Sequence, residues 1–399
     1  MEKQKDIHNY QKRLDRTIER VSPGGELTDH NSKIALGFKN ELLSQNISIS
    51  KTSRYLQDVI WLHRQLEGKN FDDVVKEDVK ALLAKMNQSN LAESTKKGIK
   101  IMLRKFYKYI RGVDEPRKYP EEVDFFTLAI TKSHSLMPEE LLNEQEMMQI
   151  IRAAKNERDK ALMAVLCESG CRVGEVGTLR IKHVSFEEIG VRITVKGKTG
   201  MRKILLIKSA PFLQIWLNNH PIGDNPEAPM WIGPNNEFLS YARIKNILRT
   251  CVKKAGIKKR VYPHLLRHSR ATILAKTLSD ANMKNYLGWA QGSKMASVYI
   301  HMSGKDTDEA ILRTNGIEIK KEETESPLKP KNCLRCNFEN PCTNKFCSKC
   351  GLPLDEETAR KIIDQETTRS RADRMMDILM QDEEIFEMIK RKKQELVNQ

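Results

Sequence analysis

Apolar residues recur every three or four positions along most of this chain, the spacing that places side chains on one face of a helix. The pattern is clear between residues 28 and 112, where one helix carries an apolar stripe made of Tyr55, Val59, Leu62 and Leu66. Ser50 precedes this stripe and is the expected N-terminal cap of the helix. Residues 1–27 are charged and end near a proline–glycine turn, so they form a partly helical N-terminal extension. Residues 28–112 are predicted to form a helical domain.

The helix expected over residues 93–110 carries two neighbouring stripes. Its apolar stripe, which contains Leu103 and Phe106, is expected to face the core. Beside it runs a basic stripe, and no carboxylate lies between residues 96 and 111. Such a stripe is either a solvated face or a surface that follows DNA phosphates, and the unbroken positive charge favours DNA. The side chains predicted to contact DNA are Lys97, Lys100, Arg104, Lys108 and Arg111.

The helical pattern changes twice further along the chain. Residues 113–137 lack steady periodicity and contain prolines, so they are expected to link two domains. In the second domain, residues 138–315, apolar and polar residues alternate over 191–195 and 204–207. This alternation predicts a β-hairpin, with Lys198 at its tip. The expected fold class is mainly α, with a small β-hairpin or sheet in the second domain.

Composition indicates the kind of partner. The 399 residues carry a formal net charge of +16, and the pI is about 9.3. Solubility alone could explain this excess, but with 31% charged residues we favour a polyanionic partner, nucleic acid. No apolar run of about 18 residues is present, so no membrane span is expected. The polar N-terminus does not resemble a signal peptide, which predicts a cytoplasmic, nucleoid-associated protein.

Four of the eight cysteines form two Cys-x-x-Cys pairs within residues 332–354. Paired thiolates at this spacing favour tetrahedral zinc, and four of them leave no position for water, so one structural ion is expected. The alternative is four thiols without metal. The segment resembles a small zinc ribbon, preceded by a flexible tether over 316–331 and followed by one long polar helix over 355–399. The predicted ligands are Cys333, Cys336, Cys347 and Cys350, whereas Cys167, Cys171 and Cys251 are expected to be buried and Cys342 to be unliganded.

Candidate chemistry is concentrated in the second domain. His264 and Arg267 lie three residues apart, so they share one face of a helix. Arg172 follows a helix-breaking glycine and begins another helix, whose N–H groups favour an anion. Glu175, three residues further on, either orients this arginine or forms a weak surface pair with it. Gly288 can end the next short helix, and Tyr299 follows a few residues later. A phenol beside guanidinium and imidazole groups is suited to phosphate chemistry.

These motifs occur in the order and approximate spacing of the tyrosine recombinase family, which includes the phage-type integrases. The resemblance covers about residues 143–301. It implies a SAM-like core-binding domain over 28–112 and an α-rich catalytic domain over 138–315 that close around duplex DNA; a C-terminal zinc ribbon is similar to those of archaeal-type integrases. The matching segments are Cys171-Arg172-Val173-Gly174-Glu175, Gly197-Lys198, Pro263-His264-Leu265-Leu266-Arg267-His268, Leu287-Gly288-Trp289 and Tyr299-Ile300-His301.

The resemblance also implies a role for each matching side chain. Tyr299 attacks a DNA phosphodiester and forms a 3′-phosphotyrosine, so strands are cleaved and rejoined without metal or ATP. Arg172 and Arg267 hold the non-bridging oxygens and stabilise the growing negative charge. Lys198 acts as general acid toward the 5′-oxygen, and His264 assists proton transfer from the tyrosine.

Trp289 occupies a position that is more often histidine in the family. Its indole can donate a hydrogen bond to phosphate but cannot act as a base. His268 and His301 are expected to be structural. The implied assembly is a homotetramer on two double-stranded DNA sites. The alternative function is a non-catalytic zinc-containing DNA-binding protein with a degenerate recombinase fold, and a type IB topoisomerase would share the proposed chemistry.

Overall fold

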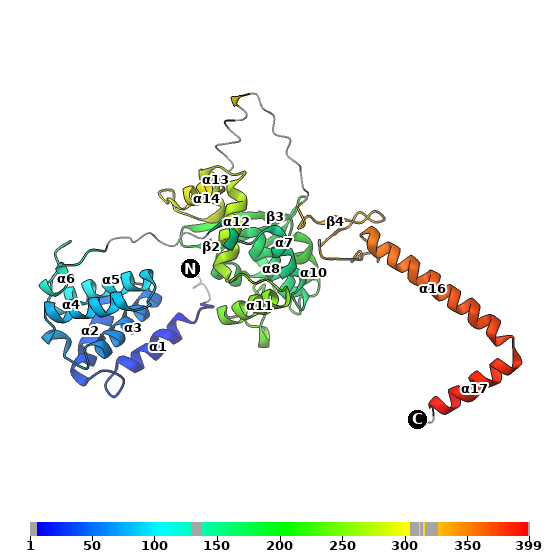
Figure 1. Cartoon of the computed structure of the whole chain (residues 1–399). Helices are drawn as coiled ribbons and strands as arrows, with labels where there is room; N and C mark the ends of the chain where they lie inside the picture. The colour runs from blue at the N-terminus through cyan, green and yellow to red at the C-terminus, as the bar shows by residue number, and fades with distance from the viewer. Residues whose placement is uncertain (1–5, 129–136, 304–310, 312–313, 316–325, 398–399) are drawn as a thin grey trace. The chain divides into compact units, whose positions relative to one another are not determined.

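The computed structural model describes residues 6–128, 137–303, 311, 314–315 and 326–397, and it divides the chain into two compact units (Figure 1). The first unit contains Met1–Pro138 with Ser240–Ala242, and the second contains Glu139–Leu239 with Arg243–Gln399. Most of the expected tether, residues 316–325, lies outside the described residues, as does the 129–136 part of the expected linker.

The first unit is built from helices, as the periodicity predicted. Thr28 caps α2, because its side chain accepts a hydrogen bond from the backbone N–H of Asn31 at 3.3 Å. Ser50 is not a cap, since α3 begins one residue earlier and Ser48 occupies the cap position. The elements are α1 (Tyr10–Val21), α2 (Asp29–Ser44), α3 (Ile49–Gln65), the 3₁₀ turn η1 (Phe71–Asp73), α4 (Lys76–Gln88), α5 (Glu93–Ile110) and α6 (Glu121–Asp124).

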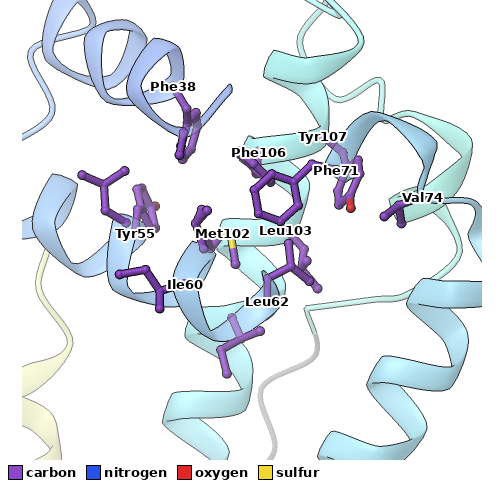
Figure 2. Packing of buried hydrophobic residues seen from close by; sticks show 14 of the residues in the cluster. Phe38, Tyr55, Ile60, Leu62, Phe71, Val74, Met102, Leu103, Phe106 and Tyr107 are labelled. Carbon is purple, nitrogen blue, oxygen red and sulfur yellow. The ribbon is translucent and has the colours of Figure 1, made fainter. Parts of the chain in front are cut away.

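Aromatic and aliphatic side chains together form the core of the first unit (Figure 2). The ring of Phe106 on α5 packs edge-on against Phe38 at 5.0 Å and against Phe71 at 5.1 Å between centroids. All three side chains are fully buried. Burial of each such side chain is worth about 1.5–3 kcal/mol, so the apolar stripe of α5 anchors this helix and leaves its basic stripe at the surface.

The second unit is organised around α8, whose residues from Ala161 to Ser169 are all buried. Helices α7, α10 and α12 pack against α8. Glu168 at its C-terminal end accepts hydrogen bonds from the backbone N–H groups of Ile207 and Lys208, at 2.8 and 2.9 Å. The helices are α7 (Glu144–Arg152), α8 (Glu157–Ser169), α9 (Val173–Gly177), α10 (Ala210–Asn218), α11 (Tyr241–Lys254), α12 (Pro263–Ala275), α13 (Asp280–Leu287) and α14 (Met295–Ser303), with 3₁₀ turns η2 (Pro138–Glu140), η3 (Ile181–His183) and η4 (Pro234–Asn236).

The predicted hairpin is present and forms part of a three-stranded antiparallel sheet. Strands β1 (Val184–Phe186), β2 (Val191–Gly197) and β3 (Gly200–Leu206) lie in that order. In the β2–β3 register Val191 is opposite Leu206 and Gly197 is opposite Gly200, which leaves Lys198 and Thr199 as the two turn residues. The mainly α fold class with a small sheet is therefore confirmed.

The cysteine-rich segment packs on the helical part of the same unit. It contains a short hairpin of β4 (Lys331–Asn332) and β5 (Glu339–Asn340), and β5 contacts α10. Just before it, Ser326 hydrogen-bonds to Glu144 and accepts a hydrogen bond from the Lys208 ammonium at 2.6 Å. Lys208 also pairs with Glu144 at 2.6 Å, so a small polar cluster fastens this segment to α7.

The C-terminal region is two helices, so the prediction of one long helix is wrong. These are α16 (Glu356–Met380) and α17 (Glu383–Val397). The break falls at Asp382, whose carboxylate accepts hydrogen bonds from the backbone N–H groups of Glu384 at 3.0 Å and Ile385 at 3.2 Å. This cap starts a new helix inside a sequence whose composition is helical throughout. No helix in the described part of the chain is both long and apolar enough to cross a membrane.

Candidate active site

Segments far apart in the sequence meet at the backbone carbonyls that end α13. The guanidinium of Arg267, on α12, donates to the carbonyl of Leu287 at 2.7 Å. Arg172, at the start of α9, donates to the carbonyl of Gly288 at 3.3 Å. The Thr199 hydroxyl, at the tip of the β2–β3 turn, donates to the same oxygen at 3.4 Å. Both predicted clamp arginines and the hairpin that carries Lys198 are thus brought to one place.

Local backbone features explain this convergence. Gly170 ends α8 in the left-handed conformation, with φ of 58°, and its carbonyl accepts from Arg267 at 2.9 Å. Gly288 ends α13 in the same way, with φ of 63°, as its position in the sequence predicted. Pro263 occupies the first turn of α12, where its missing N–H costs nothing. These helix ends expose the carbonyls that accept hydrogen bonds from the two arginines.

Glu175 is a buried ion-pair partner of Arg172 rather than a surface one. Its side chain is 4% exposed, and its carboxylate accepts from the backbone N–H and from the guanidinium of Arg172, both at 2.9 Å. A second arginine, Arg202 on β3, donates to the same carboxylate at 2.7 Å. Burial by itself would raise the pKa of Glu175, but the hydrogen bond and charge of Arg202, together with Arg172, hold that pKa below its usual value.

Two glycines permit the hairpin to approach this ion cluster. A Cβ atom at Gly288 would lie 2.5 Å from Nη1 of Arg202, and one at Gly197 would collide with the carboxylate of Glu175. Neither position therefore accommodates a side chain. The hairpin contributes Arg202 to the cluster and places Lys198, which is exposed, beside Thr199 at the same edge.

The electrostatics of the two clamp arginines favour an anion. Arg267 is 3% exposed, and its pKa falls to about 10, chiefly because the side chain is desolvated and then because Arg172 is positively charged. The guanidinium is still protonated at neutral pH. Bringing a phosphate to these groups would neutralise part of their mutual repulsion, so the arrangement is suited to binding a non-bridging phosphate oxygen.

Tyr299 is close to this cluster but its hydroxyl is directed to another group. The side chain is 3% exposed, and its hydroxyl hydrogen-bonds to Nδ1 of His268. Its ring stacks on Trp289, with centroids 5.5 Å apart and planes 4° apart. Desolvation raises the pKa of Tyr299 to about 12, even though Arg267 opposes the shift. The phenol is therefore protonated at neutral pH.

His268, which was expected to be structural, contacts the hydroxyl of the predicted nucleophile. Its ring also meets the ring of His264 edge-on at 4.6 Å. His264 is exposed; desolvation first, and then the charges of Arg267 and Arg172, lower its pKa. The side chain of His301 lies outside the described residues.

Trp289 connects the tyrosine to the arginine cluster. Its indole is 9% exposed and lies against the guanidinium of Arg267, whose central carbon is 5.4 Å from the ring centroid. The same indole stacks on Tyr299. The position that the family resemblance assigns to a phosphate donor therefore also packs against the predicted nucleophile.

In the first unit, the basic stripe of α5 separates into two groups. Arg104 lies 4.3 Å from the centroid of Tyr119, and Lys108 donates to the backbone carbonyl of Glu115 at 2.7 Å. Arg111 pairs with Glu122 at 2.6 Å. These three side chains hold the segment that follows α5. DNA contact by the stripe stays a prediction, carried most directly by Lys97 and Lys100, which are half-buried.

The four predicted metal ligands lie together in the structure. The sulfur atoms of Cys333, Cys336, Cys347 and Cys350 are all within 4.8 Å of one another. Two of the separations are 3.5 and 3.6 Å, and sulfurs bound tetrahedrally to zinc at about 2.3 Å lie about 3.8 Å apart. The cluster can therefore hold a metal ion. Cys342 is buried outside it, and Cys167, Cys171 and Cys251 are buried as expected.

Arg202 and His268 are the site residues that the sequence analysis missed. Arg202 shares one face of β3 with the buried Ile204 and Leu206, so a charge on an apolar face was the available signal. His268 follows His264 by four residues on α12, which places both on one face of the helix. Neither pattern predicts the partner of the residue, because Glu175, the partner of Arg202, and Tyr299, the partner of His268, lie on other elements.

Comparisons with known proteins identify relatives of this chain. Residues 140–305 match the phage integrase family. A tyrosine recombinase of Pseudothermotoga lettingae is 29% identical over 236 residues, which cover 57% of this chain and 75% of that protein. Tyrosine recombinase XerA of Pyrococcus furiosus is 30% identical over 184 residues, covering 44% of this chain and 62% of that protein.

Solved structures share the fold at low sequence identity. XerH site-specific recombinase, bound to a palindromic difH substrate, aligns with a TM-score of 0.55 and 18% identity, covering 79% of this chain and 98% of that chain. The Tn1549 transposon integrase in complex with transposon right end DNA gives a TM-score of 0.54 and 17% identity, covering 70% of this chain and 99% of that chain.

The fold and the relatives together indicate a site-specific DNA recombinase of the tyrosine class. Residues 140–305 thus form a phage integrase family domain, and the chain is similar to tyrosine recombinases. The family resemblance read from the motifs is therefore confirmed, and the recombinase function is favoured over a non-catalytic DNA-binding protein.

Proposed function

We propose that Tyr299 is the nucleophile of a site-specific recombination reaction on double-stranded DNA. The phenolic oxygen attacks a backbone phosphorus, its proton is removed, and the 5′-oxygen of the adjoining nucleotide leaves. The product is a 3′-phosphotyrosine, which a 5′-hydroxyl from another strand then attacks in the reverse sense. Because one phosphoester bond is formed for each that is broken, the cycle needs no ATP.

Arg172 and Arg267 bind the non-bridging oxygens in this proposal. The observation that carries it is their convergence on the end of α13, supported by the buried carboxylate of Glu175. Guanidinium groups fixed in advance stabilise charge as it develops in the transition state, which is worth a factor of about 10²–10³ per donor. Trp289, on the same loop, supplies an indole N–H toward the phosphate.

Lys198 and His264 handle the protons. Lys198 is exposed at the turn next to Thr199, which hydrogen-bonds to the carbonyl of Gly288, so its flexible side chain starts at the edge of the arginine cluster. As an ammonium it protonates the leaving 5′-oxygen. His264 has a lowered pKa, so it is neutral near pH 7 and can accept the proton of Tyr299 directly or through water.

The proposed substrate is duplex DNA held by the chain's basic surfaces. The net charge of +16 favours a polyanion, and Lys97 and Lys100 on α5 are proposed phosphate contacts. A lambda integrase tetramer bound to a Holliday junction is among the proteins of this fold. By analogy, this chain is proposed to act as a homotetramer that brings two DNA sites together.

The four-cysteine cluster is proposed to bind one zinc ion with a structural role. Four thiolates complete a tetrahedral shell, so no position is left for substrate, and the ion takes no part in the phosphate chemistry. The ion would hold β4 and β5 together, and β5 contacts α10. Zinc would thereby keep this module folded against the catalytic part of the unit.

Covalent trapping tests the proposed function. The full chain is incubated with a library of duplexes nicked near random positions, from which a short leaving fragment diffuses away and leaves the adduct stranded. Wild-type protein should give an SDS-resistant protein–DNA adduct, and digestion of the adduct should map the linked DNA to Tyr299. Tyr299→Phe should bind the same DNA and give no adduct.

Two results would contradict the proposal. An adduct of undiminished yield in Tyr299→Phe would remove this residue as the nucleophile. Wild-type protein that binds the selected DNA tightly but never forms an adduct would favour the non-catalytic alternative. Tyr286→Phe serves as the matched control, because Tyr286 is a second, half-buried tyrosine of the same unit, and its loss should leave an adduct.

A further inference from the structure

The structure shows the hydroxyl of the predicted nucleophile engaged by another side chain. The Tyr299 hydroxyl is engaged by Nδ1 of His268, its ring is stacked on Trp289, and the whole side chain is 3% exposed. A phosphate held by Arg172 and Arg267 would have to be reached by a hydroxyl released from this contact. In this resting arrangement, Tyr299 must therefore lose its hydrogen bond to His268 before it can attack.

We propose that His268 is a positioning residue that latches Tyr299 in this resting arrangement when no DNA phosphate is bound. The proposal rests on the assignment of Tyr299 as nucleophile. His268 is carried by α12 immediately after Arg267, and Tyr299 is carried by α14, which packs against α12. The latch thus joins the helix that holds the phosphate clamp to the helix that carries the attacking group.

The protonation states of His268 and Tyr299 determine which of the two donates the hydrogen bond. Burial, and then the nearby His264 and Arg267, lower the pKa of His268 to about 4, so its imidazole is neutral at physiological pH. A neutral Nδ1 with a lone pair accepts the hydrogen of the phenol, which is itself protonated because its pKa is raised to about 12. Both partners are in the protonation states that this hydrogen bond requires.

The neighbours of the latch connect it to the binding of phosphate. Trp289 touches both Tyr299 and Arg267, and Arg267 also holds the carbonyls of Gly170 and Leu287. A phosphate that accepts hydrogen bonds from Arg267 and from the indole N–H would alter Trp289, the residue against which Tyr299 stacks. We infer that binding of the scissile phosphate favours the unlatched state. When no phosphate is bound, Tyr299 stays hydrogen-bonded to His268.

Substitutions at position 268 separate the latch from simple packing. The amide oxygen of His268→Asn can replace Nδ1 as acceptor, because it lies at nearly the same distance from the backbone. His268→Gln places its amide one bond further out, and His268→Leu has no acceptor. Thr272→Val is the control on the same helix, because the Thr272 hydroxyl donates to the backbone carbonyl of His268 at 3.2 Å rather than to the tyrosine.

Two measurements are made on the full-length variants. Hydrogen–deuterium exchange without DNA reports the opening of α14 over Met295–Ser303, and the single-turnover rate of adduct formation on a nicked duplex reports release of the nucleophile. We expect His268→Leu and His268→Gln to exchange faster in α14 and to form adduct about two- to tenfold faster, the factor that loss of one hydrogen bond carries. His268→Asn should be restored toward wild type in both measurements, and Thr272→Val should match wild type in exchange.

The outcomes discriminate between this inference and the function on which it rests. If α14 exchanges equally in all variants, the latch does not exist. If adduct formation slows in His268→Leu and His268→Gln, the residue assists the reaction instead, and the inference is overturned. If wild-type protein forms no adduct at all, the proposed function fails, whereas the exchange data still decide whether His268 restrains Tyr299.

Discussion

Arg202 on β3 lies 2.7 Å from the carboxylate of Glu175 on α9, and their side chains are only 12% and 4% exposed. This pair joins the hairpin to the helix start that carries Arg172. Because Glu175 also accepts two hydrogen bonds from Arg172, one buried carboxylate fixes both a strand and a clamp arginine. The position of Arg172 thus depends on Glu175 and, through it, on Arg202.

Glu175→Gln should therefore impair catalysis through Arg172. The amide keeps the shape of the side chain but cannot neutralise two guanidinium groups, and loss of one partner from a buried ion pair costs about 3–5 kcal/mol of stability. We expect a lower melting temperature and adduct formation slowed about tenfold or more, because a displaced donor stabilises the transition state poorly. Glu187→Gln is the control, since Glu187 pairs with Arg192 at the surface. Equal rates in both variants would contradict the role of Glu175.

Arg267→Lys should abolish most of the activity although charge is conserved. The guanidinium donates to the carbonyls of Gly170 and Leu287 with two different nitrogens, and a lysine ammonium cannot reproduce that fork. We expect adduct formation to fall by a factor of about 10²–10³ with DNA affinity nearly unchanged. Single-turnover cleavage and equilibrium binding measure the two quantities, and Arg360→Lys on exposed α16 provides the control. A rate within twofold of wild type would exclude Arg267 from the clamp.

Much of the fold could be predicted because it depends on local patterns. Helical periodicity and Gly288 as a helix end were both evident in the sequence, and the structure confirms them. The exceptions arose from competition between neighbouring signals. Ser48 and Ser50 both lie near the start of α3, and Asp382 interrupts an otherwise helical composition by capping a second helix.

The site could be predicted only in part, because motifs identify residues but not their partners. The motif order assigned Arg172, His264, Arg267 and Tyr299, and the fold brings their helices together. The contact between Tyr299 and His268 depends on how α14 packs against α12, which no local pattern specifies. The partners of α5 depend in the same way on the segment that follows it, and this explains why three of the five side chains in its basic stripe are engaged within the unit.

Stability should decrease in acid partly because of His268. Its pKa is lowered from 6.5 to about 4 in the folded chain, so the unfolded chain binds more protons between these values. The stabilising contribution is complete above pH 6.5 and is lost as the pH falls through 4. Other histidines with lowered pKa act in the same direction, so the difference between variants is decisive. His268→Asn should lose less stability than wild type between pH 7 and pH 4 in denaturant titrations, and parallel curves would contradict the shift.

Removal of metal should unfold the ribbon. Purified protein is expected to contain about one zinc ion per chain, and cobalt substitution should give the absorption of a tetrahedral thiolate site. Cys333→Ser should lose the metal and expose the 326–355 segment to protease, whereas Cys342→Ser should retain it because that thiol lies outside the cluster. A metal-free wild-type protein with a protease-resistant segment would contradict the zinc assignment. Chelation should leave the helices of the first unit intact.

DNA affinity should depend on salt, and α5 should account for part of that dependence. Each lysine that contacts a phosphate displaces counterions, so Lys97→Gln with Lys100→Gln should reduce the slope of log affinity against log salt by about two. Arg111→Gln should instead lower the stability of the first unit, because Arg111 pairs with Glu122 at 2.6 Å and donates to the carbonyl of Asp72. Lys390→Gln with Lys392→Gln removes the same charge from α17 and controls for net charge. An unchanged slope in the α5 double variant would show that this helix faces solvent, and the DNA surface would then have to be sought on other elements.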